Sequence, residues 1–65
     1  MDAKIGVAAG DVYRFLEAEG ASTVSQLKKA TGHSDATINQ AIGWLAREEK
    51  VSREMHGRTA RWSLA

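Results

Sequence analysis

Apolar residues recur at steps of three and four through most of this chain, which is the spacing that places side chains on one face of a helix. Three such stripes follow one another and predict helices over about residues 5–19, 24–30 and 35–48. The residues of the stripes are Ile5, Ala8, Ala9, Val12, Phe15 and Leu16 in the first, Val24, Leu27 and Ala30 in the second, and Ile38, Ala41, Ile42 and Leu45 in the third.

Residues that favour helix ends stand between the stripes. Gly20 follows the first stripe, as expected for a residue that closes a helix in the left-handed conformation. Thr23 precedes Gln26 by three residues, which is the spacing of a capping box, in which each side chain accepts from the other residue's backbone N–H. Ser34 is suited to cap the third helix, and Asp35 favours the positive end of its dipole. Short connectors are therefore predicted between the helices.

The period changes in the C-terminal part of the chain. Apolar and polar residues alternate on both sides of a connector that contains Gly57, which predicts a β-hairpin over about residues 51–64. An isolated hairpin is marginal in water, so its apolar side chains must pack on the helices. We expect Trp62 to close the hairpin over the third helix, with Val51 and Leu64 beside it. Between the first two helices, the connector is long enough only for an extended linker or a single strand-like bridge.

Three helices, a tight turn before the third and a terminal hairpin form an order that resembles the winged helix-turn-helix, an α+β fold. The resemblance covers nearly the whole chain, so residues 1–65 are expected to form a single domain. Segments 5–10, 26–29 and 42–48 are similar to a family of small prokaryotic winged helices of unknown function. The resemblance implies binding of double-stranded DNA, in transcription regulation, with the third helix in the major groove.

The side of the third helix opposite its apolar stripe carries the candidate base contacts. Gln40 or Asn39 can bond bidentately to adenine, and Arg47 can contact guanine or a phosphate. Contacts to phosphates are expected from basic residues of the second helix and of the hairpin, namely Lys28, Lys29, Arg53, Arg58 and Arg61.

Charge limits the strength of this binding. Nine Lys and Arg residues stand against eight Asp and Glu residues, so the net charge is only +1. Phosphate contacts supply most of the non-specific affinity of a DNA-binding protein, so we expect weak binding of low specificity. The alternative is a module for protein–protein interaction or self-association that has the same fold and does not bind nucleic acid.

Two glycines in the first predicted helix point to close packing. Gly6 and Gly10 lie one turn apart, near Tyr13, and a helical glycine costs about 1 kcal/mol relative to alanine. Such a cost favours a role in close approach of another surface. We therefore expect a homodimer, with these three residues as candidates for the interface.

Sixty-five residues suffice for one domain with a small core. The chain has no cysteine, and His33 and His56 are both expected to be exposed in turns. No catalytic, metal or cofactor site is therefore predicted, and we expect neither an enzyme nor a small-molecule substrate. Because the N-terminus lacks a targeting pattern and no apolar run is long enough for a bilayer, we expect a cytoplasmic protein without a membrane partner.

Overall fold

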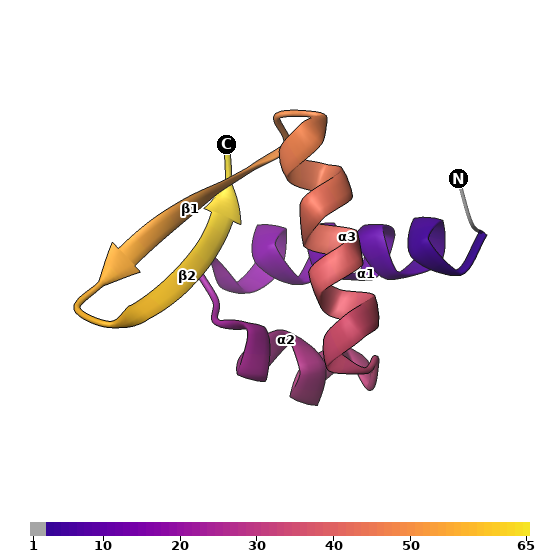
Figure 1. Cartoon of the computed structure of the whole chain (residues 1–65), viewed down its shortest axis with the longest axis horizontal. Helices are drawn as coiled ribbons and strands as arrows, with labels where there is room; N and C mark the ends of the chain where they lie inside the picture. Colours follow the sequence, from indigo (N-terminus) through magenta and orange to yellow (C-terminus); the bar gives the residue numbers. More distant parts are fainter. Residues whose placement is uncertain (1–2) are drawn as a thin grey trace.

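A computed structural model of the chain describes residues 3–65, with side chains from residue 5 onward. The elements in chain order are α1 (Ala3–Glu19), α2 (Val24–Thr31), α3 (Asp35–Arg47), β1 (Val51–His56) and β2 (Thr59–Leu64). The predicted α+β layout of three helices and an antiparallel hairpin is confirmed. Each helix boundary lies within two residues of its prediction, with α1 starting two residues earlier. Figure 1 shows α3 crossing α1, with α2 below the crossing and the hairpin to one side.

The capping interactions predicted at the helix ends are present in the structure. The backbone N–H of Gln26 donates to Thr23 Oγ1 at 3.2 Å, and the N–H of Thr23 donates to Gln26 Oε1 at 2.8 Å, which completes the capping box. The N–H of Thr37 donates to Ser34 Oγ at 3.2 Å at the start of α3. Gly20 closes α1 with a φ of +81°. Because these bonds span at most three residues, the order of neighbouring residues was sufficient to predict them.

The core lies where α3 crosses α1. The predicted inward face of α3 is buried against α1, and α2 adds the fully buried Leu27. Ala30, which completes the predicted stripe of α2, is exposed, because this short helix covers the core mainly through Leu27. Phe15 is only partly buried. The buried core residues are Ala8, Ala9, Val12, Leu16, Leu27, Ile38, Ala41, Ile42, Leu45 and Val51.

The hairpin is attached through the connector between α1 and α2. The N–H of Ser22 donates to the carbonyl of Trp62 at 2.9 Å, and the N–H of Trp62 donates back at 2.8 Å. This single bridge, an arrangement that the sequence allowed, places β2 between Ser22 and β1, so that β1 is the edge. The apolar side of the hairpin packs on the helices as expected, with Trp62 and Leu64 against the core, and β2 lies beside α1 while β1 lies beside α3.

A polar contact joins the connector between α2 and α3 to α1. The Nε2–H of His33 donates to Asp11 Oδ2 over 2.9 Å, and the guanidinium of Arg14 also donates to Asp11. The prediction of an exposed loop histidine is wrong for His33, because its side chain is only 21% exposed. The hydrogen bond from His33 lowers the pKa of Asp11 below its ordinary value, and Arg14 acts in the same direction, whereas partial burial opposes it.

The substitution Asp11→Asn tests this contact. A lowered folded pKa means that the carboxylate stabilises the fold above its unfolded pKa and loses this effect as the pH falls through the folded pKa. We therefore expect Asp11→Asn to reduce the free energy of unfolding by at most about 1 kcal/mol near pH 6, and by less as the pH falls below 3.8. Urea unfolding across this pH range measures both, with Glu17→Gln on the same helix as the control. An equal loss at every pH would contradict the assignment.

Candidate nucleic-acid interface

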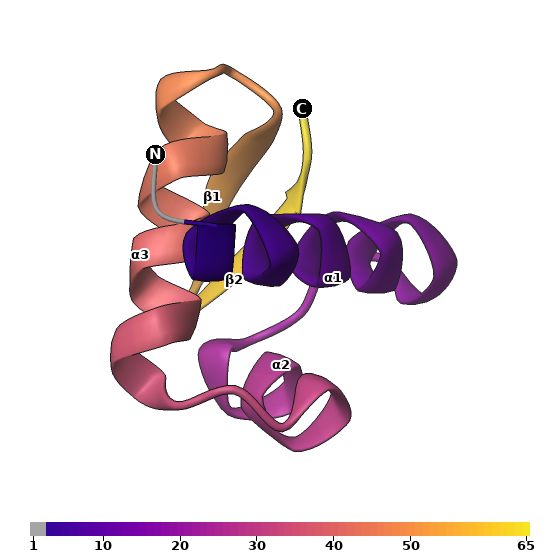
Figure 2. The ribbon, with the colours of Figure 1, turned by 90° about the vertical axis from the view of Figure 1, so that its right-hand side faces the viewer.

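The outer face of α3, defined as the side opposite its buried apolar stripe, is open to solvent. Figure 2 shows α3 at the edge of the molecule, with α1 on its inner side and no other element across its outer side. Because Ile38 and the rest of its apolar stripe are buried, the residues on the opposite side of the helix must face solvent. The exposed residues of the outer face are Ala36, Asn39, Gln40, Gly43 and Arg47.

Gln40 and Arg47 lie beside the same hollow. An open depression of about 300 Å³ is lined by Gln40, Gly43, Trp44 and Arg47 of α3 together with Ile5 of α1. A carboxamide and a guanidinium are the side chains that read adenine and guanine edges in the major groove. The outer face therefore presents suitable groups about two turns apart on one helix.

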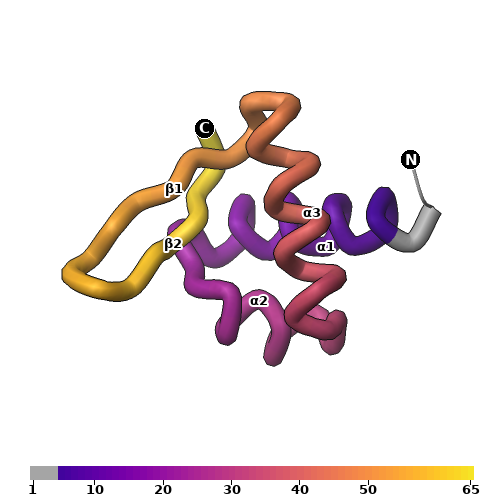
Figure 3. Tube along the Cα trace, viewed as in Figure 1, coloured from indigo at the N-terminus to yellow at the C-terminus, as the bar shows by residue number. Residues whose placement is uncertain are grey.

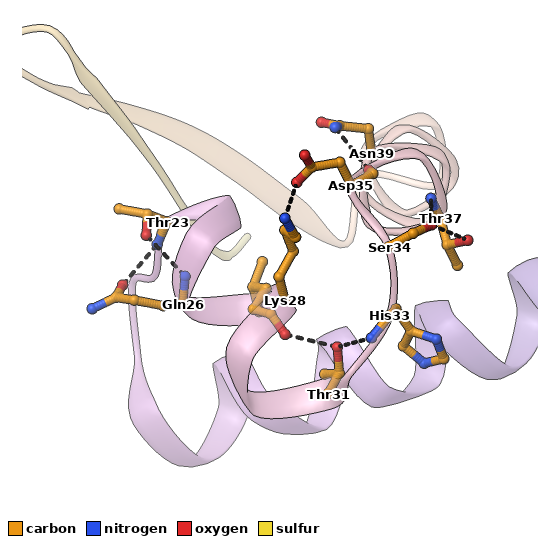
Figure 4. Close-up of polar contacts among 10 residues, drawn as sticks. Thr23, Gln26, Lys28, Thr31, His33, Ser34, Asp35, Thr37 and Asn39 are labelled. Atoms are coloured by element: carbon orange, nitrogen blue, oxygen red, sulfur yellow. Dashed lines mark hydrogen bonds and ion pairs between the residues drawn. The ribbon is translucent and has the colours of Figure 1, made fainter.

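Asn39 and Lys28 have partners within the fold. The Nδ2 of Asn39 donates to the carbonyl of Asp35 at 2.9 Å, which turns the amide back along its own helix. The ammonium of Lys28 lies 3.0 Å from Asp35 Oδ1 and forms an ion pair between α2 and α3, as Figure 4 shows. Contact of either residue with DNA would have to compete with these bonds, whereas the neighbouring Lys29 is exposed.

The hairpin separates its arginines. Arg53 is paired with Trp62, and Glu54 is paired with Arg61, and residues paired across an antiparallel ladder share a face. Arg53 and Arg61 therefore lie on opposite faces of the hairpin, so one flat surface cannot contact both. The alternation of residues along the two strands was already sufficient to predict this separation. Arg58 lies in the turn, at the end of the hairpin away from the helices (Figure 3).

Gly43 leaves a gap at the centre of the outer face. A Cβ atom built on Gly43 would meet no atom within 4 Å, so the packing of the fold does not require a glycine there. The residue lies inside a helix, where glycine costs about 1 kcal/mol relative to alanine. Glycine at an exposed helical position leaves room for another backbone or for a base edge to approach the helix closely.

The described residues contain neither a cluster of metal ligands nor a helix that could span a membrane. Among the described residues, no three His, Asp or Glu side chains gather closely enough to hold a metal ion. None of the helices described within residues 3–65 combines the length and the apolar composition that crossing a bilayer requires.

Comparisons with known proteins agree with this architecture. Residues 1–64 match the family described as a winged helix-turn-helix domain, DUF2582. An uncharacterized protein of Methanocaldococcus jannaschii is 43% identical over 51 residues, which cover 74% of this chain and 71% of that protein. The solution NMR structure of a Bacteroides thetaiotaomicron protein has a TM-score of 0.88 at 29% identity and covers 98% of this chain and 79% of that chain. A Corynebacterium diphtheriae crystal structure, 24% identical, shares the fold with a TM-score of 0.80 over 94% of this chain and 11% of that chain.

The effect of Gly43 on the stability of the fold can be measured by substitution. Gly43→Ala should raise the free energy of unfolding by about 0.5–1 kcal/mol, because alanine favours the helix and the added methyl group meets open space. Gly32→Ala is the matched control, since its Cβ also meets no atom within 4 Å but its φ is +77°. That change should lower the stability by about 1 kcal/mol. Urea unfolding of both variants tests the pair, and a destabilised Gly43→Ala would mean that the fold itself needs this glycine.

Proposed function

This chain belongs to the DUF2582 family of winged helix-turn-helix domains, and we propose that it binds double-stranded DNA with α3 in the major groove. The observation that carries the proposal is the outer face of α3. There Gln40 and Arg47 flank Gly43, whose missing side chain weakens the helix and is not required by the packing. A helix that must lie close to base edges benefits from such a gap.

The residues divide into base contacts and phosphate contacts. Gln40 is suited to adenine and Arg47 to guanine, and Asn39 joins them once its bond to its own helix is released. Lys29 and Arg58 are the exposed cations best suited to phosphates. Either Arg53 or Arg61 adds a phosphate contact, according to the face of the hairpin that meets DNA. Lys28 adds another once its ion pair with Asp35 is released.

The charge distribution supports weak binding of low specificity. The net charge is +1, and Asp35 stands at the start of α3, where a phosphate would otherwise be favoured. Neutralisation of about three phosphates corresponds to a slope of about −2.7 in a plot of log affinity against log salt. A low-specificity role in transcription regulation, in the cytoplasm, is the function that this binding would serve.

A duplex titration tests the proposal directly. Fluorescence anisotropy with a labelled random duplex should give an affinity that falls about 40-fold between 50 and 200 mM salt, because that slope acts over a fourfold change in concentration. Amide NMR shifts should concentrate on α3 and the hairpin. Salt-independent binding, or no binding at 50 mM salt, would remove the proposal.

Two substitutions on α3 separate contact from folding. Arg47→Gln should weaken binding by about tenfold, because it removes a charged contact worth on the order of 1.4 kcal/mol. Gly43→Ala should also weaken binding while it stabilises the protein, so lost affinity cannot be ascribed to unfolding. Gly10→Ala, a glycine of α1 away from the outer face, is the matched control and should leave duplex affinity unchanged.

The alternative is a protein-interaction or self-association module. Among the described residues, the large hydrophobic side chains that are strongly exposed are Val7 on α1 and Met55 on β1, which lie on different elements. This separation favours DNA over an apolar protein partner. A homodimer through Gly6, Gly10 and Tyr13 stays a prediction. Sedimentation of the protein at several concentrations measures its mass, and a constant mass of one chain would contradict a dimer.

A further inference from the structure

A groove separate from the outer face of α3 lies along the crossing of α1 and α3. It encloses about 280 Å³, and its floor is apolar, because Ala9 and Leu45 are both almost fully buried. Gly6 and Gly10 form one wall and carry no side chains, so the groove stays open on the α1 side. The lining residues are Gly6, Ala9, Gly10, Tyr13, Arg14, Trp44, Leu45 and Lys50.

The rim of the groove combines aromatic rings with positive charge. Tyr13 and Trp44 are half-buried, so each packs on the core while part of its ring remains accessible. The ammonium of Lys50 lies 5.8 Å from the centre of the Trp44 ring. The backbone N–H of Lys50 donates to the carbonyl of Leu45 at 2.9 Å, which holds the residue at this position.

The charged residues that line the groove, Arg14 and Lys50, are both cations. Arg14 is paired with Asp11, whereas Lys50 forms no ion pair among the described residues. No acidic side chain belongs to the lining. An apolar floor, aromatic walls and one available cation are complementary to a flat apolar molecule that carries a negative group.

We propose that this groove binds a small aromatic carboxylate. The ring would lie over Ala9 and Leu45, between Tyr13 and Trp44, and the carboxylate would pair with Lys50. The volume is near the lower end for ligand pockets, which limits the ligand to about one ring with a short side chain. The proposal is independent of DNA binding, and the sequence alone did not indicate any small-molecule ligand.

A second copy of the chain, as in the homodimer predicted through Gly6, Gly10 and Tyr13, would compete for this groove. In a twofold dimer whose axis passes through the groove, two concave surfaces would face each other and leave a gap, which makes the second copy the poorer occupant. A single-ring ligand would leave no such gap, because it enters the groove from solvent. Its ring would contact Tyr13 and Trp44, and its carboxylate would pair with Lys50.

A matched set of probes tests the role of charge. Phenylacetate, 2-phenylethanol and phenethylamine share one ring and a short chain and differ in charge. In amide NMR titrations of the full chain, phenylacetate should shift Gly6, Gly10, Tyr13 and Trp44, with a dissociation constant on the order of millimolar. It should bind about fivefold more tightly than 2-phenylethanol, and phenethylamine should bind most weakly.

Two variants test the groove itself. Gly10→Leu should abolish the phenylacetate shifts by filling the groove, since its Cβ meets only the flexible end of Arg14 at 3.4 Å. Ala18→Leu, an exposed position of the same helix outside the groove, is the control and should bind as the parent does. Lys50→Met keeps the apolar stem and should remove the preference for phenylacetate over 2-phenylethanol.

Three results would overturn the proposal. Equal affinity for all three probes would remove the role of Lys50, and phenylacetate shifts confined to other regions would remove the groove. Changes at the groove on dilution, without any probe, would mean that a second copy fills it.

Discussion

The crossing of α3 over α1 is the contact on which the other features of this protein depend. Ala8 and Ala9 of α1 and Ala41 of α3 are buried there, and small side chains at a contact allow two helices to approach closely. A chain of 65 residues has few buried contacts, so this one is a large share of its stability. Once the apolar side of α3 faces α1, the opposite side must face solvent.

The hairpin is positioned by a much smaller contact. The pair of hydrogen bonds between Ser22 and Trp62 ties β2 to the connector after α1 and leaves β1 as the edge strand. An open edge is a site for unwanted pairing with other chains, and charged side chains such as Arg53 and Glu54 on that edge oppose it. The bridge therefore determines both where the hairpin projects and which strand is exposed.

The two candidate surfaces share one side chain. Trp44 lines the hollow beside Gln40 and Arg47, and it also lines the groove at the crossing with α1. Both surfaces contain helical glycines, Gly43 in one and Gly6 and Gly10 in the other, at a cost in helix stability. Glycines that destabilise a helix are expected at surfaces that bind another molecule, because function and stability compete there.

The sequence alone determined what depends on neighbouring residues. Helix ends, the capping box of Thr23 and the alternation of the strands involve bonds or periodicities that span a few positions, so they were predictable. The separation of Arg53 from Arg61 follows from the same alternation, although the composition of the hairpin alone suggests that both contact phosphates.

Only the tertiary structure decided what depends on how the elements cross. The bond from His33 to Asp11 joins residues 22 positions apart, and the packing of β2 on α1 follows from the Ser22 bridge. The groove at Gly10 and Trp44 likewise exists only because two helices meet at a particular angle. Local patterns do not encode that angle, because it results from the combined packing of side chains that are distant in the chain.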